Sequence, residues 1–210
     1  MDLGTIIYYT FYIFAFLFAL SLHEFSHGAV ANLFGDPTAR YAGRLTLNPL
    51  AHLDPLGTLA FIISATQRVG FGWAKPVPVD PRYFKDQRRG MMYVGLAGPL
   101  SNLTLAIVLT LVLRVFPGFF MGSYWGEIAG EFLALNIWIN LTLAVFNLIP
   151  LPPLDGSKIL AGLLPPRQAY QFLRLEAYGP ILLLLFLMSG AGAAFLRPVL
   201  TLLGRLLGIS

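Results

Sequence analysis

Four long stretches without a charged side chain constrain this chain more than any other feature. They cover residues 3–22, 91–113, 132–154 and 177–196. A helix needs about 20 predominantly apolar residues to cross the hydrocarbon core of a bilayer. Charged residues make up 11% of the 210 residues, against about 25% in an ordinary soluble domain. We therefore predict an all-α polytopic membrane protein with about four transmembrane helices, surrounded by a lipid bilayer. The modest net charge of +4 leads us to expect no nucleic-acid partner.

Three shorter segments complete the predicted fold. Residues 55–67 are apolar but too short to span, which favours a re-entrant or interfacial segment. Residues 39–47 loosely alternate in polarity, and Pro76 and Pro78 prevent a helix over residues 75–79. These two runs predict a small β-hairpin or sheet at the membrane. We treat residues 1–210 as one integral membrane domain, with a core over about 5–160 and an extra C-terminal span over about 177–196.

The connections between the spans differ in charge. Residues 36–89 contain eight Lys and Arg side chains, residues 117–131 contain none, and residues 155–176 contain three. The positive-inside rule places the first and third connections in the cytoplasm, and the N-terminus outside. Arg197 and Arg205 fit this topology less well, because they would lie outside.

The first apolar stretch ends in an H-E-x-x-H motif formed by His23, Glu24 and His27. On a helix, positions i and i+4 differ by about 40° in azimuth, so both imidazoles can reach one metal ion. Glu24 lies beside them and can act as a general base toward water. A charged residue beside a span costs about 2.5–3.5 kcal/mol on insertion scales, so three ionisable residues within five indicate function.

A catalytic zinc site needs a third protein ligand and an open position for water. His52, Asp155 and the remaining carboxylates compete for this place. Asp155 follows the third apolar stretch, which runs in the same direction as the first. The H-E-x-x-H motif and Asp155 are therefore both expected near the cytoplasmic face, as residues that share one metal must be. Alternatively, Asp155 begins a turn or caps the next helix.

Two motifs together resemble the site-2 protease family of intramembrane zinc metalloproteases. They are H-E-x-x-H at residues 23–27 and N-x-x-P-x-P-P-L-D-G at residues 147–156. The segments 48–58 and 98–102, the latter G-P-x-x-N, are also similar to that family, and the resemblance runs from about residue 15 to residue 160. No stretch is long and polar enough for the PDZ or CBS domain of some relatives, so the chain resembles a compact form.

The resemblance implies His23, His27 and Asp155 as ligands of one zinc ion per chain, and Glu24 as the catalytic base. It further implies hydrolysis of peptide bonds within or near transmembrane segments of single-span membrane proteins, that is, regulated intramembrane proteolysis. The expected location is a prokaryotic cell membrane, with the active site near its cytoplasmic face.

Three further polar residues are candidates for secondary roles. Asn147 lies about two helical turns before Asp155 and could donate to a developing oxyanion, or it could form an ordinary interhelical hydrogen bond. His52 could assist the reacting carbonyl, line the cavity, or pin an active-site loop over residues 48–58, and we favour pinning. Asn102 is interpreted as a packing device between helices.

Two other functions fit parts of the pattern. A membrane divalent-metal transporter also uses intramembrane His and Asp residues, but no relay of acidic residues crosses the other spans. A catalytically silent membrane adaptor could keep the fold and the metal, but the motif here is intact. Retained zinc uptake in a Glu24→Gln variant would favour the transporter.

Overall fold

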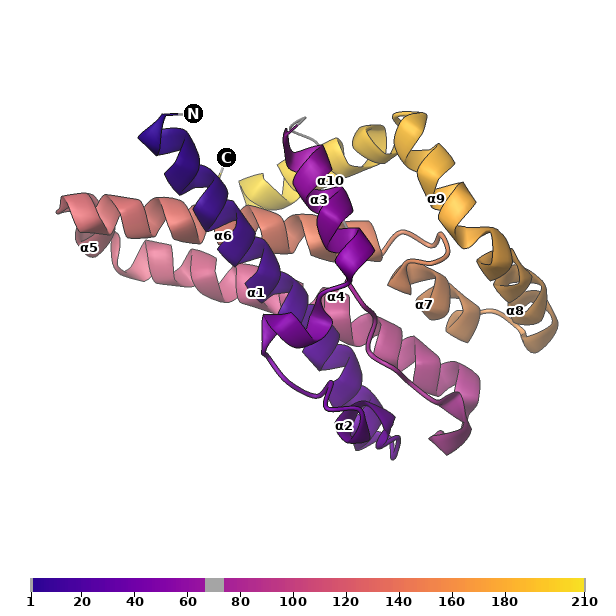
Figure 1. The fold of residues 1–210 in the computed structure, drawn as a ribbon. Coiled ribbons are helices and arrows are strands. Elements are labelled where there is room, and N and C mark those ends of the chain that lie inside the picture. The colour runs from indigo at the N-terminus through magenta and orange to yellow at the C-terminus, as the bar shows by residue number, and fades with distance from the viewer. Residues whose placement is uncertain (1, 67–73, 210) are drawn as a thin grey trace.

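The computed structural model describes residues 2–66 and 74–209, and the ordered elements there are helices (Figure 1). The predicted all-α membrane architecture is confirmed, because four helices are long and apolar enough to span a bilayer: Gly4–Leu33, Gln87–Val115, Tyr124–Asn147 and Pro166–Met188. The α-helices are α1 (Leu3–Leu33), α2 (Thr38–Tyr41), α3 (Pro55–Thr66), α4 (Gln87–Val115), α5 (Pro117–Met121), α6 (Tyr124–Asn147), α7 (Asp155–Leu163), α8 (Pro166–Leu173), α9 (Gly179–Met188) and α10 (Ala191–Leu207). Three short 3₁₀ helices are η1 (Pro49–His52), η2 (Pro81–Tyr83) and η3 (Arg174–Tyr178).

Helix α1 is longer than a bilayer core is thick. Its 31 residues correspond to about 46 Å, against about 30 Å of hydrocarbon. Asp2 caps its first turn by accepting from the N–H of Thr5 at 2.7 Å. The helix ends at Leu33, and Gly35 then takes a φ of 97°, which favours glycine. The C-terminal turns of α1 therefore extend to the membrane boundary, where they carry the H-E-x-x-H motif.

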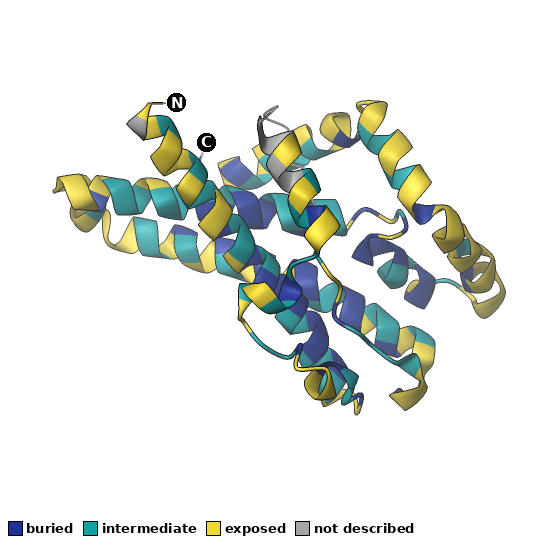
Figure 2. Ribbon diagram, viewed as in Figure 1, coloured by how far each residue is buried: buried dark blue, intermediate teal, exposed yellow. Residues whose placement is uncertain are grey.

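The core lies where α1, α4 and α6 cross (Figure 1). Helix α4 packs against α1, α6 and α7, and its buried positions are mostly small or polar, including Gly95, Gly98 and Ala106. Small residues let membrane helices approach closely. Buried residues gather at this crossing, whereas the outer parts of the helices are exposed (Figure 2). Exposed apolar side chains such as Phe14 and Leu185 match a surface that contacts lipid.

The third and fourth predicted spans had wrong boundaries. Helix α6 ends at Asn147 rather than at residue 154, and the Pro-rich segment after it turns into α7. The predicted span over residues 177–196 is broken, because α9 ends at Met188 and Gly190 has a φ of 76°. Helix α10 then turns back onto α6, where Leu200, Leu203 and Leu207 pack against the buried cluster of Ala106, Ile137 and Leu141.

The predicted β-hairpin is wrong. Residues 38–41 form α2, and Gly43 turns the chain with a φ of 64°. The run over residues 75–79 is extended, but in the described part of the chain it joins no sheet, and one isolated bridge links Leu53 to Ala74. Two side chains and the backbone carbonyl of His52, rather than a neighbouring strand, bond to its backbone groups, as described below.

The re-entrant path predicted for residues 55–67 has no support in the structure. Helix α3 covers Pro55–Thr66, and residue 67 lies outside the described residues. Asp54 caps this helix by accepting from the N–H of Gly57 at 2.8 Å. Pro55 occupies the first helical position, where its missing N–H is tolerated.

Candidate metal centre and active site

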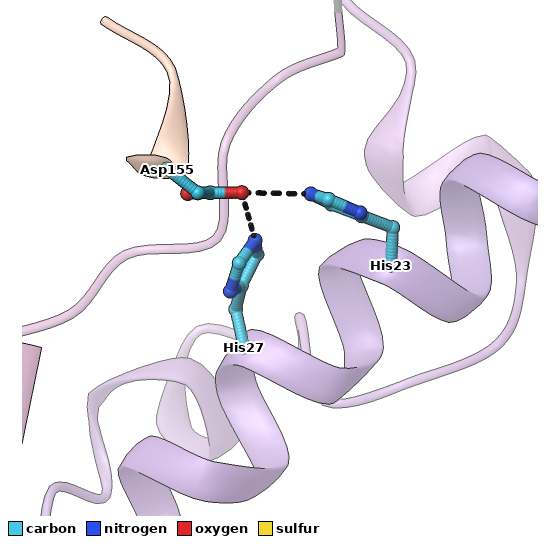
Figure 3. Close-up of side chains that lie close together, drawn as sticks. All are labelled: His23, His27 and Asp155. Carbon is cyan, nitrogen blue, oxygen red and sulfur yellow. Dashed lines mark hydrogen bonds and ion pairs between the residues drawn. The ribbon is translucent and has the colours of Figure 1, made fainter. Parts of the chain in front are cut away.

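Three residues predicted as metal ligands lie together in the structure. His23 and His27 project from successive turns of α1, and Asp155 is the first residue of α7 (Figure 3). Asp155 Oδ2 lies 3.0 Å from His23 Nε2 and 3.1 Å from His27 Nε2. All three residues are buried, and their candidate ligand atoms lie within 4.8 Å of one another.

The partners of the remaining ring nitrogens determine which nitrogen of each imidazole carries a proton. His27 Nδ1 lies 2.6 Å from the backbone carbonyl of Val94, which can only accept, so Nδ1 donates. His23 Nδ1 lies 2.7 Å from Asn102 Oδ1, which likewise can only accept. In the neutral rings both Nε2 atoms are then acceptors, and both face the acceptor Asp155 Oδ2.

Three acceptor atoms that converge in a buried place repel one another unless a cation lies between them. Two imidazole nitrogens and one carboxylate oxygen form the donor set of many catalytic zinc sites, which keep a fourth position for water. His23, His27 and Asp155 therefore fit a divalent metal such as zinc by the chemistry of their facing atoms. Both Nδ1–H groups are also bonded, as the outer shell of such sites requires.

The second oxygen of Asp155 has its own cation. Lys158, one turn later on α7, donates from Nζ to Asp155 Oδ1 at 2.9 Å. The ammonium group of Lys158 stabilises the ionised form of Asp155 through this hydrogen bond and by its charge. The carboxylate is therefore ionised, with Oδ1 engaged by Lys158 and Oδ2 directed at the two histidines.

Glycines let the three elements of the site approach one another. A Cβ on Gly98 of α4 would lie 2.5 Å from His23 Cε1 and 2.6 Å from His27 Nε2. A Cβ on Gly95 would lie 3.2 Å from the Asp155 carbonyl oxygen. The absent side chains thus make room for both imidazoles and for the first turn of α7 against α4.

Glu24 lies between the two histidines on α1 and faces residues 75–80, which we call the strap. The backbone N–H of Val77 in the strap donates to Glu24 Oε2 at 2.9 Å. Glu24 is about nine-tenths buried, with 9% of its surface exposed. The strap therefore fixes one oxygen of the residue predicted to act as the base.

Two side chains, one before and one after α2, hold the strap at both ends. Arg44 Nη2 donates to the carbonyl of Lys75 at 2.6 Å and to that of Pro76 at 3.4 Å. At the other end, the N–H of Asp80 donates to Asp36 Oδ2 at 2.7 Å, and Asp36 is completely buried. These bonds replace the sheet ladder that the sequence predicted for this segment.

A cavity of about 610 Å³ opens onto the ligand cluster. On α1 its lining recurs every four residues, at Tyr8, Tyr12, Phe16, Leu20 and Glu24, so it forms a row that winds slowly around the helix, by about 40° per step. From Tyr8 to His27 this row is about 28 Å long. Helices α6 and α9 complete the lining with mostly apolar side chains: Leu135, Trp138, Ile139, Leu143, Phe146 and Leu183. The cavity is therefore a mostly apolar groove, with its histidines, carboxylates and Lys158 at one end and the hydroxyl groups of Tyr8 and Tyr12 toward the other.

Asn147 and His52, two of the three residues with predicted secondary roles, have different surroundings. Asn147 lines the cavity, and its Nδ2 donates to the carbonyl of Leu143 at 3.0 Å. His52 is buried and is not among the residues that line the cavity. Its Nε2 lies 2.8 Å from the Thr46 carbonyl, and its own carbonyl accepts from the N–H of Lys75 at 2.9 Å. These contacts agree with a pinning role for His52.

Three residues of the site were not predicted from the sequence: Arg44, Lys158 and Asn140, which bonds to Asn102. Lys158 carried a usable signal, because it follows Asp155 by three positions on one helical face. Asn140 is an amide within an apolar span, and such residues usually bond to another helix. Nothing in the local sequence indicates that Arg44 reaches the strap.

Known proteins similar to this chain carry names that indicate zinc-dependent proteolysis. The model of peptidase family M50 matches residues 119–189. "Putative zinc metalloprotease YwhC" of Bacillus subtilis is 42% identical over 184 residues, which cover 87% of this chain and 82% of that protein. "Putative zinc metalloprotease Rip2" of Mycolicibacterium smegmatis is 31% identical over 83% of this chain and 65% of its own length. "Putative zinc metalloprotease MJ0611" of Methanocaldococcus jannaschii is 32% identical over 66% of this chain and 62% of its own length.

No solved structure matches the chain significantly. The likeness to YwhC extends over most of both proteins, and the apolar helices agree with a membrane enzyme. The chain therefore belongs to peptidase family M50, the site-2 protease family, and is a membrane metalloprotease.

Proposed function

We propose that this protein is a zinc metalloprotease that hydrolyses peptide bonds within or next to the transmembrane segments of single-span membrane proteins, as in regulated intramembrane proteolysis. One observation carries the proposal: the buried His23, His27 and Asp155 cluster closes an apolar groove among membrane-spanning helices. A soluble protease would need no such groove, whereas an apolar substrate segment can leave lipid only for an apolar surface.

His23 Nε2, His27 Nε2 and Asp155 Oδ2 would hold one zinc ion per chain. When bound, zinc polarises the scissile carbonyl and makes water more acidic. Glu24 accepts the proton of the attacking water and delivers it to the leaving amine. Because the N–H of Val77 binds Oε2, the carboxylate of Glu24 keeps a set direction during both transfers. Lys158 keeps Asp155 Oδ1 away from the cluster.

Asn147 is the proposed donor to the developing oxyanion. Its amide carries two N–H bonds, and the carbonyl of Leu143 takes one of them. The other can point into the cavity that Asn147 lines. A preorganised donor in a water-poor site contributes about 2.7–4 kcal/mol to transition-state stabilisation in comparable hydrolases. His52 acts only on the loop and the strap.

The groove supports a membrane-spanning substrate segment, and the charge pattern supports an orientation of the protein in the membrane. The row of α1 side chains in the groove wall is about 28 Å long, close to the thickness of the hydrocarbon core, and supports entry of an apolar segment from the bilayer. His23 lies about 30 Å along α1, and basic residues concentrate in the connection that follows. These features support an active site near the cytoplasmic face of a cell membrane. The bacterial and archaeal sources of the similar proteins support a prokaryotic one.

Purified wild type and Glu24→Gln, reconstituted in lipid nanodiscs, test the proposal with a panel of single-span substrates. Zinc content is measured in both. We expect the variant to keep its zinc and to lose cleavage at least about 100-fold, because the base is removed while the ligands remain. Wild-type cleavage by Glu24→Gln would refute the role of Glu24. Zinc binding without cleavage in both proteins would instead favour transport or an adaptor, which zinc flux into liposomes separates.

A further inference from the structure

A chain of hydrogen bonds connects three membrane-spanning helices to one ring nitrogen at the metal centre. On α6, Asn140 Nδ2 donates to the backbone carbonyl of Asn136 at 2.8 Å. On α4, Asn102 Nδ2 donates to Asn140 Oδ1 at 2.7 Å and to the carbonyl of Ala19 at 3.0 Å. On α1, His23 Nδ1 lies 2.7 Å from Asn102 Oδ1. Asn102 and Asn140 are completely buried.

Backbone carbonyls fix the direction of every bond in this chain. The Asn136 carbonyl can only accept, so it faces the NH₂ group of Asn140, and the oxygen of Asn140 must point toward Asn102. The Ala19 carbonyl likewise faces the NH₂ group of Asn102, so the oxygen of Asn102 points toward His23. Neither amide can flip without placing two acceptors in contact.

This order leaves one tautomer for His23. Its Nδ1 must carry the proton, and its Nε2 must offer a lone pair toward Asp155. His27 obtains the same tautomer more simply, from the backbone carbonyl of Val94. Among the contacts of the described residues, the ring of His23 has no such carbonyl, and the side chains of two other helices take its place.

We propose that Asn140 and Asn102 are positioning residues that act in series to fix the tautomer and aim of His23 as a metal ligand. This inference rests on the proposed function, because it takes His23 to be a ligand. Removal of Asn140 leaves an N–H of Asn102 unsatisfied in a buried site, so Asn102 turns or shifts and His23 loses its acceptor. Asn140 thus acts on the metal through two hydrogen bonds, from a helix that carries no ligand.

The alternative is that these amides only hold the helices together, as polar residues in membranes often do. The chain offers a matched control for this alternative. Asn136 lies one turn before Asn140, is also buried, and also donates to a carbonyl four residues back, that of Phe132. Its side chain has no bond to Asn102 or His23 among the described contacts. A merely structural role predicts that Asn140→Leu lowers the stability of the fold but leaves the zinc Kd of the folded protein unchanged, as in Asn136→Leu.

The test compares Asn140→Leu, Asn102→Leu and Asn136→Leu with wild type in nanodiscs. Leucine is close to asparagine in shape but cannot form hydrogen bonds. The measured quantity is the zinc Kd, from competition with a chromophoric chelator, on protein that elutes as a single folded species. The visible absorption of Co²⁺-loaded protein reports the ligand geometry independently of cleavage.

We expect Asn102→Leu and Asn140→Leu to raise the zinc Kd about 10- to 100-fold and to change the Co²⁺ spectrum. Asn136→Leu should leave both unchanged. Equal zinc Kd values for Asn140→Leu and Asn136→Leu would overturn the inference, and this pair suffices if Asn102→Leu does not fold. If the wild-type protein binds zinc and cleaves its substrates, and the variants bind zinc with unchanged Kd, this inference alone is refuted. Wild type without zinc affinity would refute the proposed function as well.

Discussion

Gly98→Ala should disable the metal centre through a single methyl group. A Cβ at this position would lie 2.5 Å from His23 Cε1 and 2.6 Å from Nε2 of both His23 and His27, whereas ordinary contacts begin at 3.4 Å. The imidazoles, or helices α1 and α4, must therefore move apart by about 0.8–0.9 Å. Metal–ligand distances tolerate only about 0.2 Å.

The magnitude follows from this displacement. A misplacement of about 1 Å at a reacting centre costs about 100-fold, and we expect the zinc Kd to rise by at least that factor, about 2.8 kcal/mol. If the helices separate instead of the rings turning, the strain destabilises the fold by about 1–3 kcal/mol. Either response is measurable, and cleavage should fall with zinc occupancy.

The assay compares the zinc Kd and thermal unfolding of Gly98→Ala with those of Gly130→Ala. A Cβ on Gly130, in α6, meets its nearest atoms at 3.5 Å, which is an ordinary contact. This control should keep wild-type zinc affinity and stability. A Gly98→Ala protein with unchanged affinity and unchanged stability would show that α4 does not pack on the imidazoles, and would refute the reasoning.

Three other substitutions test separate parts of the site. Lys158→Met should raise the zinc Kd about tenfold, because Asp155 Oδ1 loses its hydrogen-bond partner. Lys158→Arg should recover most of the zinc affinity. Substitution of the exposed Lys85 by Met serves as the control. Arg44→Met should lower kcat about tenfold with zinc content unchanged, because the strap that fixes Glu24 is released. The exposed Arg40 provides the control, and an equal loss of kcat in Arg40→Met would contradict this role of Arg44. The pKa of Asp86 is lowered by the N–H of Arg89, so its cap on α4 stabilises the fold above about pH 3.9 and is lost as pH falls further. Asp86→Asn should therefore flatten the acid limb of thermal stability, and an unchanged limb would mean that another group controls it.

Much of the site could be predicted from the spacing of residues along the sequence, because the geometry of a single helix determines which of them share a face. The i, i+4 spacing of His23 and His27 fixes their common face wherever the helix lies. The lengths of the apolar stretches likewise predicted the spanning helices. Asp155 needed more information, since its place beside α1 depends on how α7 docks on α4, and the pairing of two motifs supplied it.

The wrong parts of the prediction depended on backbone conformation and on contacts between helices, which length and polarity do not encode. Residues 38–41 form a helical turn, although the sequence predicted a strand. A short alternation of polarity does not distinguish a strand from a turn when no partner strand is present. Gly190 breaks the last apolar stretch, since a left-handed residue is invisible to a hydropathy average. Asn140 was missed because its role is defined only by Asn102 on another helix.

The docking of α7 against glycines of α4 has a consequence for how the protein is made. Asp155 follows His23 by 132 positions and reaches it only when α7 lies against Gly95. A nascent chain inserted through α4 carries both histidines but lacks the carboxylate of the proposed site. On the proposed ligand set, tight zinc binding waits until the last third of the chain has assembled, and the ion then cross-links two distant segments. The enzyme would thus be inert during its own membrane insertion and become hydrolytic only as the final helices settle.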